Sequence, residues 1–190
     1  MTRVLLLCTA NICRSPMAET LLKRRSVLRS VLSVHSAGLL REGDPPPRGV
    51  IAAMAAYGLD ISSHRSHVVH AGELAAADLV LGMAREHVRH VVVAAPETWP
   101  RTFTLKELVR RGQEVGPRKP GEPVADWLAR VHEGRDRMAL LGDSPDDDVA
   151  DPIGGPPQVY AATAALLDQL LGSLVEICWG VAAGGLPGQP

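Results

Sequence analysis

The sequence predicts an α/β fold in which helices cover both faces of a parallel β-sheet. Short, continuous apolar runs, such as residues 4–8, have the length and composition of strands that are buried on both faces. These runs alternate with longer segments in which apolar residues recur at helical spacing, as they do in βαβ units. The chain has 190 residues, and a chain of this length buries about two thirds of its extended surface in one core.

Four runs of apolar or β-branched residues predict the strands. We expect them at residues 4–8, 31–36, 78–83 and 98–104. The crossovers between parallel strands should be right-handed. Ligands in such sheets bind outside the carboxyl ends of the strands, so the loops that follow the strands are the first places to look for a site.

Local signals place the helices between these strands. Ser15 and Pro16 have the pattern of an N-cap followed by proline at the first helical position, which predicts a helix from there to Leu28. Leucines form an apolar stripe along the final helix. We expect the other helices at residues 50–57, 85–95, 105–111, 124–132 and 156–181, the last with Leu166, Leu167, Leu170, Leu171 and Leu174 as its stripe.

Composition narrows the class of protein. Aromatic residues make up only 3% and the net charge is −1, so neither base-stacking platforms nor a general polyanion-binding surface is expected, and nucleic acid is not an expected partner. Three cysteines are too few for a secreted disulfide scaffold and favour a reducing cytoplasm. No signal peptide is expected, because the N-terminal apolar run, residues 4–8, is too short. No membrane partner is expected, because the longest apolar segment, residues 166–183, contains Asp168, Gln169 and Glu176.

The loop after the first strand carries the chemistry. Cys8 and Arg14 are separated by five residues, Thr9, Ala10, Asn11, Ile12 and Cys13, whose backbone N–H groups can converge on one tetrahedral oxyanion. The helix that starts near Ser15 adds its positive end, and Arg14 can bind two oxygens at once. This positive field favours the thiolate form of Cys8. A thiolate beneath a bound phosphate is an in-line nucleophile.

Each cysteine also has a structural interpretation. A free cysteine at a strand end is usually a small buried hydrophobe, but the strand, the spacing and the Arg-Ser-Pro sequence together favour Cys8 as a nucleophile. Cys13 is either a redox partner that forms a reversible disulfide with Cys8 or part of the loop's packing, and the residues do not choose between these. Cys178 is expected in the core.

Residues 8–19, Cys-Thr-Ala-Asn-Ile-Cys-Arg-Ser-Pro-Met-Ala-Glu, resemble the phosphate-loop signature of the low-molecular-weight protein-tyrosine phosphatase family. The resemblance covers roughly residues 3–111 and 148–178 and implies a three-layer α/β/α fold around a four-stranded parallel sheet. It implies one phosphatase domain over residues 1–183, an insertion at about 112–147 and a flexible tail at 184–190. Four further segments resemble segments of the family and occur in the same order along the chain: residues 36–38, 64–66, 78–83 and 151–152.

The resemblance also implies roles for the other site residues. Asp151, before Pro152, corresponds to the family's general acid, although spacing alone does not choose among the five aspartates of residues 143–151. For the run 146–148, the alternative is a solvated acidic loop. The Ser15 hydroxyl would bond the Cys8 sulfur, and Ser36 and His64 would hold Asn11 in a left-handed conformation. The alternative for His64 is a surface histidine.

The predicted function is therefore a two-step phosphatase without metal or other cofactor, acting on a phosphorylated protein or a small phosphomonoester. His64, His67 and His70 repeat at a spacing of three, but no nearby acidic or cysteine ligand completes a metal site. Three alternatives stay open: a protein-arginine phosphatase of the same family, a thiol-dependent arsenate reductase and a non-catalytic phosphate-binding module. The oligomeric state is not predicted.

The scarcity of aromatic residues bears on specificity. Members of the family that act on phosphotyrosine typically have aromatic cleft walls, yet residues 39–47 contain none and Ile153 follows Asp-Pro. Residues 103–108 and 151–155 resemble the corresponding segments of the family's phosphoarginine phosphatases. Ile12, in contrast, is the residue typical of the family's phosphotyrosine phosphatases at that position of the loop. Trp127 is either a replacement wall or, as for most single aromatics on an apolar helix face, part of the core.

Overall fold

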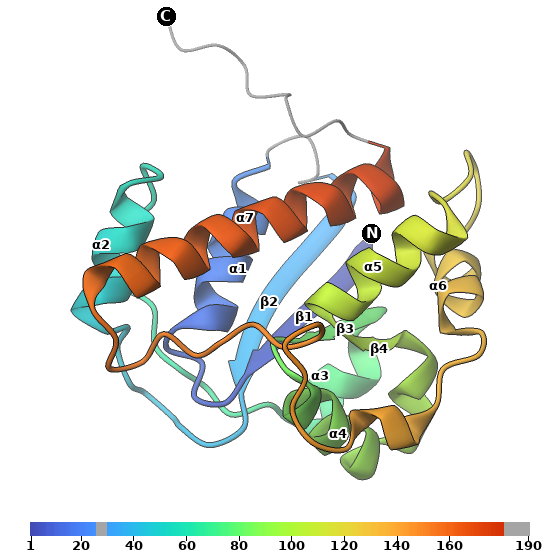
Figure 1. Cartoon of the computed structure of the whole chain (residues 1–190), viewed down its shortest axis with the longest axis horizontal. Helices are drawn as coiled ribbons and strands as arrows, with labels where there is room; N and C mark the ends of the chain where they lie inside the picture. The colour runs from blue at the N-terminus through green and yellow to red at the C-terminus, as the bar shows by residue number, and fades with distance from the viewer. Residues whose placement is uncertain (26–29, 181–190) are drawn as a thin grey trace, which may run out of the picture.

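The computed structural model describes residues 1–25 and 30–180 and has the predicted α/β architecture (Figure 1). The predicted helix end at Leu28 and the predicted flexible tail at 184–190 lie outside the described residues. In chain order, the elements are β1 Thr2–Cys8, α1 Arg14–Lys23, β2 Leu32–Gly38, α2 Arg48–Ala55, α3 Ala71–Ala76, β3 Leu79–Gly82, α4 Arg85–Ala94, the 3₁₀ helix η2 Pro96–Arg101, β4 Thr102–Thr104, α5 Leu105–Val115, α6 Val124–His132, the 3₁₀ helix η3 Arg137–Leu140 and α7 Pro157–Trp179.

The four strands form one parallel sheet in the order β2-β1-β3-β4. Strand β1 pairs with β2 on one side and β3 on the other, so that Cys8 lies opposite Gly38 and Leu7 opposite Gly82. The chain reverses its direction of winding at β1. The loop after β1 therefore lies at the switch point of the sheet, where open α/β folds bind their ligands.

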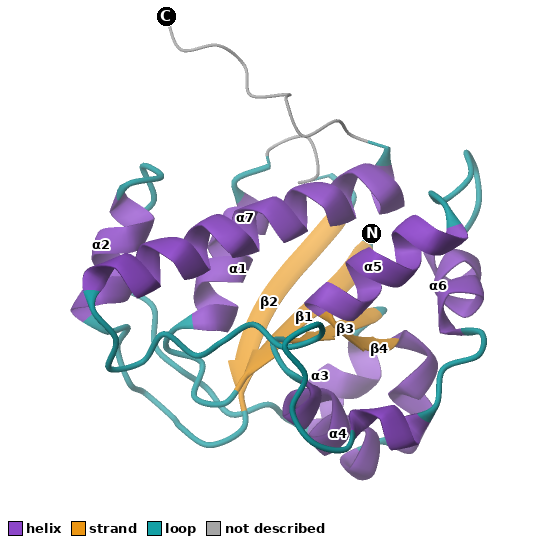
Figure 2. Ribbon diagram, viewed as in Figure 1, coloured by secondary structure: helices purple, strands orange, loops and turns teal. Residues whose placement is uncertain are grey.

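Successive side chains of β1 point to opposite faces of the sheet. Val4, Leu6 and Cys8 pack with α1, α2, α5 and α7, whereas Leu5 and Leu7 pack with α3 and α4. Figure 2 shows the strands between these two groups of helices. All seven residues of β1 except the first two are buried, which explains why its sequence is continuously apolar rather than alternating.

Three local predictions were wrong. Helix α1 begins at Arg14, so Ser15 lies in its first turn and is not the N-cap; its hydroxyl bonds Cys8 instead. Residues 98–101 belong to η2 and only Thr102–Thr104 is strand, because Pro100 cannot donate to a sheet ladder. Helix α3 was not predicted, since its six residues are too few to show a clear period.

The segment 112–147 packs into the body of the molecule. Trp127 is fully buried on α6, and its indole nitrogen donates to the Gly116 carbonyl at 3.1 Å. Gly112 lets this ring approach α5, since a Cβ there would lie 3.0 Å from it. Trp127 is thus a core residue, and the interpretation of it as an active-site wall was wrong.

Helix α7 has the length and apolar composition of a membrane span. Its buried face, which includes Leu167, Leu171 and Leu174, packs in the main core against α1, α2 and α5. Of the predicted stripe, Leu166 and Leu170 are only partly buried. The core helix of a globular domain passes the same test of length and composition, and the packing of α7 accounts for its apolar character.

Candidate active site

The loop of residues 9–13 joins the end of β1 to the start of α1 and lines a cavity of about 370 Å³. Gly38 at the end of β2 allows the loop to lie against the sheet, because a Cβ there would meet the backbone of Ala10 and Asn11 at 3.0 Å. Cys8 is one of the residues that line the cavity. The other lining residues are Thr9, Ala10, Ile12, Cys13, Arg14, Leu40, Arg41, Asp151 and Ile153.

A chain of hydrogen bonds leads from the Cys8 sulfur into the core. Ser15 Oγ lies 3.0 Å from Cys8 Sγ and accepts from Asn11 Nδ2 at 3.0 Å. The same amide group donates to Ser36 Oγ at 2.9 Å, and the Ser36 hydroxyl donates to Glu19 at 2.5 Å. Since the Asn11 amide donates to Ser15, the serine hydroxyl keeps its own proton to donate, and both the Cys8 sulfur, at 3.0 Å, and the Ala37 carbonyl, at 3.4 Å, lie within its reach.

Asn11 has a φ of 53°, in the left-handed region that few residues other than glycine adopt. His64 Nε2 bonds the Asn11 carbonyl at 2.7 Å, and the backbone N–H of His67 donates to Asn11 Oδ1 at 3.1 Å. The Asn11 side chain itself is fully buried. Contacts from His64 and His67 thus hold Asn11 in this conformation.

Arg14 is buried at the mouth of the loop, with 4% of its surface exposed. Its Nη1 donates to the Val149 carbonyl at 3.1 Å, and its Nη2 donates to Thr9 Oγ1 at 3.2 Å and to Asp151 Oδ2 at 2.6 Å. Arg14 Nε is buried and has no hydrogen-bond partner among the described residues. A buried guanidinium N–H without a partner is costly, and an anion in the cavity would satisfy it.

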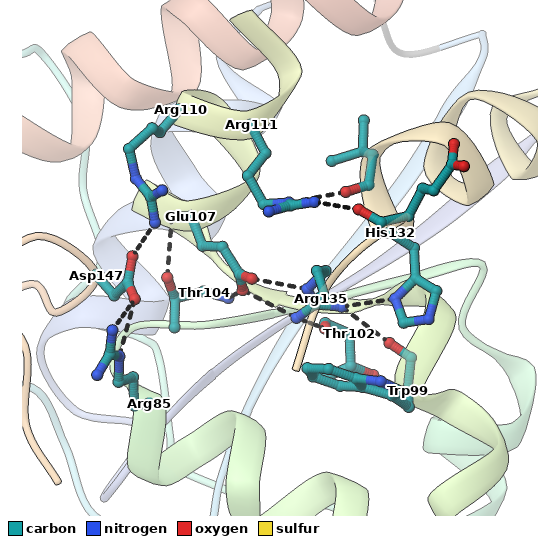
Figure 3. Close-up of polar contacts among 12 residues, drawn as sticks. Arg85, Trp99, Thr102, Thr104, Glu107, Arg110, Arg111, His132, Arg135 and Asp147 are labelled. Atoms are coloured by element: carbon teal, nitrogen blue, oxygen red, sulfur yellow. Dashed lines mark hydrogen bonds and ion pairs between the residues drawn. The ribbon is translucent and has the colours of Figure 1, made fainter. Parts of the chain in front are cut away.

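Asp151 comes from a loop that is firmly attached to the sheet. Val149 N donates to the Met83 carbonyl at the end of β3, and Asp148 accepts from the backbone N–H of Arg85 and Ser144. Figure 3 shows Asp147 bonded to Arg85 and Arg110, at 2.7 and 2.6 Å. The ion pairs hold the pKa of Asp147 below its usual value although burial opposes them.

These contacts correct the interpretation of residues 146–148 as a solvated acidic loop. Asp147 is buried, with 6% of its surface exposed, and only Asp146 of the three is an exposed residue. The nearby Arg135 is bonded to Glu107 and so attaches the segment 112–147 to α5 (Figure 3). Its guanidinium also stacks on the rings of Trp99 and Phe103. Asp147 and Asp148 therefore attach the segment that carries Asp151 to α4 and α5.

The cavity walls are aliphatic. Ile12, Leu40 and Ile153 lie around the phosphate loop, and none of the described lining residues is aromatic. Arg41 adds a positive charge at the mouth, where it pairs with Asp44 at 3.0 Å.

The second loop cysteine, Cys13, lines the same cavity as Cys8. Cys13 is buried, and burial raises the pKa of its thiol to about 12, with Asp151 and Cys8 adding to the effect. Burial likewise raises the pKa of Cys178 on α7 to about 12. Both thiols are protonated at neutral pH and are poor nucleophiles.

The repeated histidines have separate partners. His64 bonds Asn11, His67 bonds Glu73 at 3.0 Å, and His70 stands at the N-terminus of α3. The described part of the chain contains no group of three or more histidine, cysteine or acidic residues that could hold a metal ion.

Two contributors to the site were not assigned from the sequence. Glu19 anchors the Ser36 hydroxyl, and His87 on α4 bonds Thr9 Oγ1 at 3.0 Å. Glu19 belongs to the conspicuous motif after Cys8, so its position was a usable signal. His87 lies three residues after the helix N-cap, which is a capping-box position, but nothing in the sequence connects it to a loop nearly eighty residues earlier.

Comparison with known proteins agrees with the fold and gives the family of the chain. Residues 3–120 match the family described as low molecular weight phosphotyrosine protein phosphatase. The chain belongs to this family. It is the family whose phosphate-loop signature residues 8–19 resemble.

The relatives include both branches of the family. A probable low molecular weight protein-tyrosine-phosphatase EpsP of Ralstonia solanacearum is 32% identical over 143 residues, which are 73% of this chain and 97% of the relative. A protein-arginine-phosphatase of Geobacillus stearothermophilus is 30% identical over 175 residues, covering 92% and 94% of the two chains.

Solved structures give the same picture. The YwlE arginine phosphatase from Geobacillus stearothermophilus superposes with a TM-score of 0.69 at 30% identity, covering 93% of this chain and 92% of that one. The low molecular weight protein tyrosine phosphatase from T. tengcongensis has the same TM-score at 34% identity, covering 93% and 99%. This chain is therefore a phosphatase of the low-molecular-weight type.

Proposed function

We propose that this protein hydrolyses phosphotyrosine in phosphorylated proteins, without a metal, through a cysteinyl-phosphate intermediate. The observation that carries the proposal is the convergence of Cys8, Arg14 and Asp151 on one cavity at the switch point of the sheet. The three side chains supply a nucleophile, a binder of phosphate oxygens and a proton donor, which are the groups that phosphoryl transfer to a thiolate requires.

In the first step, the Cys8 thiolate attacks phosphorus from the base of the loop. A sulfur–phosphorus bond forms as the bond to the leaving oxygen breaks, and the Asp151 carboxyl gives that oxygen its proton. The loop N–H groups and the Arg14 guanidinium bind the three non-bridging oxygens, on which the transition-state charge is spread. The unpartnered Nε of Arg14 supports this role.

In the second step, Asp151, now a carboxylate, takes a proton from a water molecule, and the resulting hydroxide attacks phosphorus. The sulfur–phosphorus bond breaks and Cys8 leaves as a thiolate. The Ser15 hydroxyl, 3.0 Å from the sulfur, stabilises that thiolate, while Asn11, Ser36 and His64 hold the loop in shape.

Several features extend the proposal. The buried core contacts of Trp127 support one domain over residues 1–183, and we propose residues 112–147 as an insertion in that domain. The site's reliance on a free Cys8 thiol supports a cytoplasmic location. Cys13, which lines the same cavity as Cys8, is the candidate for a redox partner.

The second candidate function is a protein-arginine phosphatase. The aliphatic cavity walls favour it, because they lack the rings that stack on a phenyl group. Asp151, beside the catalytic loop and partly exposed, could also pair with the guanidinium of a phosphoarginine. The likeness to the Geobacillus arginine phosphatase supports this candidate, and Ile12 favours the tyrosine substrate.

Matched phosphotyrosine and phosphoarginine peptides with identical flanking residues distinguish the two candidates. We expect kcat/KM to be at least about tenfold higher for the phosphotyrosine peptide, a typical discrimination by one pocket. The measurement is phosphate release by wild type, with Cys8→Ser as the blank. A preference of similar size for phosphoarginine would overturn the tyrosine assignment and keep the rest of the mechanism.

A further inference from the structure

A second cavity, of about 560 Å³, opens beside the catalytic one. Thr9 and Leu40 line both cavities, so the two lie side by side. One wall of the second cavity is Leu39 and Leu40, after β2, and the other is the solvent-facing stripe of α4 that ends in Val93 and Ala94. We call this second cavity the α4 groove.

The α4 groove combines fixed walls with exposed apolar side chains. The backbone N–H groups of Leu39 and Leu40 both donate to the Thr9 carbonyl, at 2.8 and 3.2 Å, so that wall is attached to the phosphate loop. Leu40 is 70% exposed and Val93 is 77% exposed. Two large apolar side chains that face water in a groove beside a catalytic cavity are typical of a binding subsite.

Polar groups in the α4 groove suit a polypeptide. Glu86 presents a half-exposed carboxylate, and His90 is an exposed residue of the same helix face. Together they offer an acceptor and a donor to the N–H and C=O groups of an extended chain. The family acts on phosphorylated proteins, and the segment beside a phosphorylated residue must leave the catalytic cavity through an adjoining surface.

We propose that the α4 groove binds the polypeptide segment next to the phosphorylated residue of a protein substrate, with an aliphatic side chain of that segment packed between Leu40 and Val93. The groove thereby gives the enzyme a preference for sites with a nearby aliphatic residue. This inference rests on the proposed phosphatase function.

Val93→Glu tests it, with Val115→Glu at the end of α5 as the matched control, since both residues are exposed on helices and Val115 lies outside the groove. The substrates are p-nitrophenyl phosphate and two phosphopeptides that differ only in carrying leucines or serines around the phosphorylated residue. We expect wild type to prefer the leucine peptide by about fivefold, roughly the value of one buried aliphatic contact. Val93→Glu should lose that preference.

The outcomes separate the two proposals. Loss of the leucine preference in Val93→Glu, with p-nitrophenyl phosphate turnover within twofold of wild type and Val115→Glu unchanged, supports the α4 groove. A preference that survives Val93→Glu, or that never existed in wild type, overturns it and leaves the phosphatase function intact. A wild-type protein that hydrolyses none of the three substrates contradicts the proposed function itself.

A second inference, independent of the groove, concerns His87 on the buried side of α4. His87 is fully buried, and its Nδ1 accepts from the backbone N–H of Ala84 at 2.9 Å. Burial lowers the pKa of His87 to about 3, and Arg14 adds to the effect. The ring is thus neutral, with its proton on Nε2, which faces Thr9 Oγ1 at 3.0 Å.

The Thr9 hydroxyl has a full set of partners. It donates to Glu86 at 3.2 Å and accepts from His87 Nε2 and from Arg14 Nη2, the latter at 3.2 Å. Its orientation is fixed by these three contacts. We infer that His87 is a positioning residue that acts through Thr9, since it holds the hydroxyl where it fixes the plane of the Arg14 guanidinium.

Thr9→Val removes the hydroxyl at nearly constant shape, and Thr9→Ser restores it. We expect Thr9→Val to lower kcat/KM for p-nitrophenyl phosphate about tenfold, the effect of one hydrogen bond to a charged group. It should weaken inhibition by inorganic phosphate to a similar degree, because both depend on Arg14. Thr9→Ser should recover most of both losses.

A double-mutant cycle separates positioning from simple support of the fold. If His87 acts through Thr9, His87→Ala and Thr9→Val together should cost no more than the larger single loss, whereas independent effects would multiply. Multiplying losses, or a Thr9→Val enzyme with unchanged phosphate inhibition, would refute the role. Should His87→Ala fail to fold, the same cycle with His87→Phe, which keeps a buried ring but removes the Nε2 donor, decides.

Discussion

Cys8→Ser is expected to lower kcat for p-nitrophenyl phosphate by at least about 10⁴-fold, the usual cost of removing a catalytic nucleophile. A serine hydroxyl keeps its proton at neutral pH and is a far weaker nucleophile than a thiolate. The phosphate loop, Arg14 and the hydrogen bond to Ser15 do not depend on sulfur. Inorganic phosphate should therefore still bind, which isothermal titration calorimetry measures.

The matched control is Cys178→Ser, which removes a buried thiol from α7 and leaves the loop intact. The Cys178→Ser variant should have wild-type activity at temperatures well below its own unfolding temperature. Turnover near the wild-type rate in Cys8→Ser would exclude Cys8 as the nucleophile.

Asp151→Asn is expected to lower kcat by about 10²- to 10³-fold on a phosphate ester with a poor leaving group, since general acid catalysis contributes about this much. Phenyl phosphate needs its leaving oxygen protonated far more than p-nitrophenyl phosphate does. The loss should therefore be larger for phenyl phosphate. Steady-state rates with the two esters measure this difference.

Asp146→Asn is the matched control, because Asp146 is an exposed residue of the same loop. It should change kcat by less than about twofold, as surface substitutions without partners usually do. If Asp151→Asn slowed both esters equally, the carboxylate would act only through its contact with Arg14, and another group would have to supply the proton.

The phosphate loop was predictable because its signals are local. A buried strand, five loop residues, Arg14 and the Ser-Pro helix start are contiguous, and the parallel topology then places them at the carboxyl edge of the sheet. The family resemblance indicated that Ser36 and His64 hold the loop, but the sequence did not reveal two further contacts to it. His67 and His87 reach it from distant segments, and single histidines carry no periodic pattern that indicates such contacts.

The acidic segment shows a second limit. Five aspartates in nine residues favour a solvated loop from composition alone, yet Asp147 is buried between two arginines. Those arginines come from α4 and α5, so the pairing depends on tertiary structure. The end of η2 was mistaken for strand for a related reason: Trp99 and Phe103 have strand propensity, but the backbone limits of Pro96 and Pro100 prevail.

The central claim is that Cys8 carries the phosphoryl group between the two steps. The most direct test is to mix Asp151→Asn with p-nitrophenyl phosphate, quench in acid and map the phosphorylated peptide by mass spectrometry. The good leaving group permits the first step, and the missing base slows the second, so the intermediate should accumulate. The account predicts one phosphoryl group per chain, bonded to Cys8. A chain that turns over substrate with no phosphoryl group on Cys8, or with it on another residue, would contradict the account.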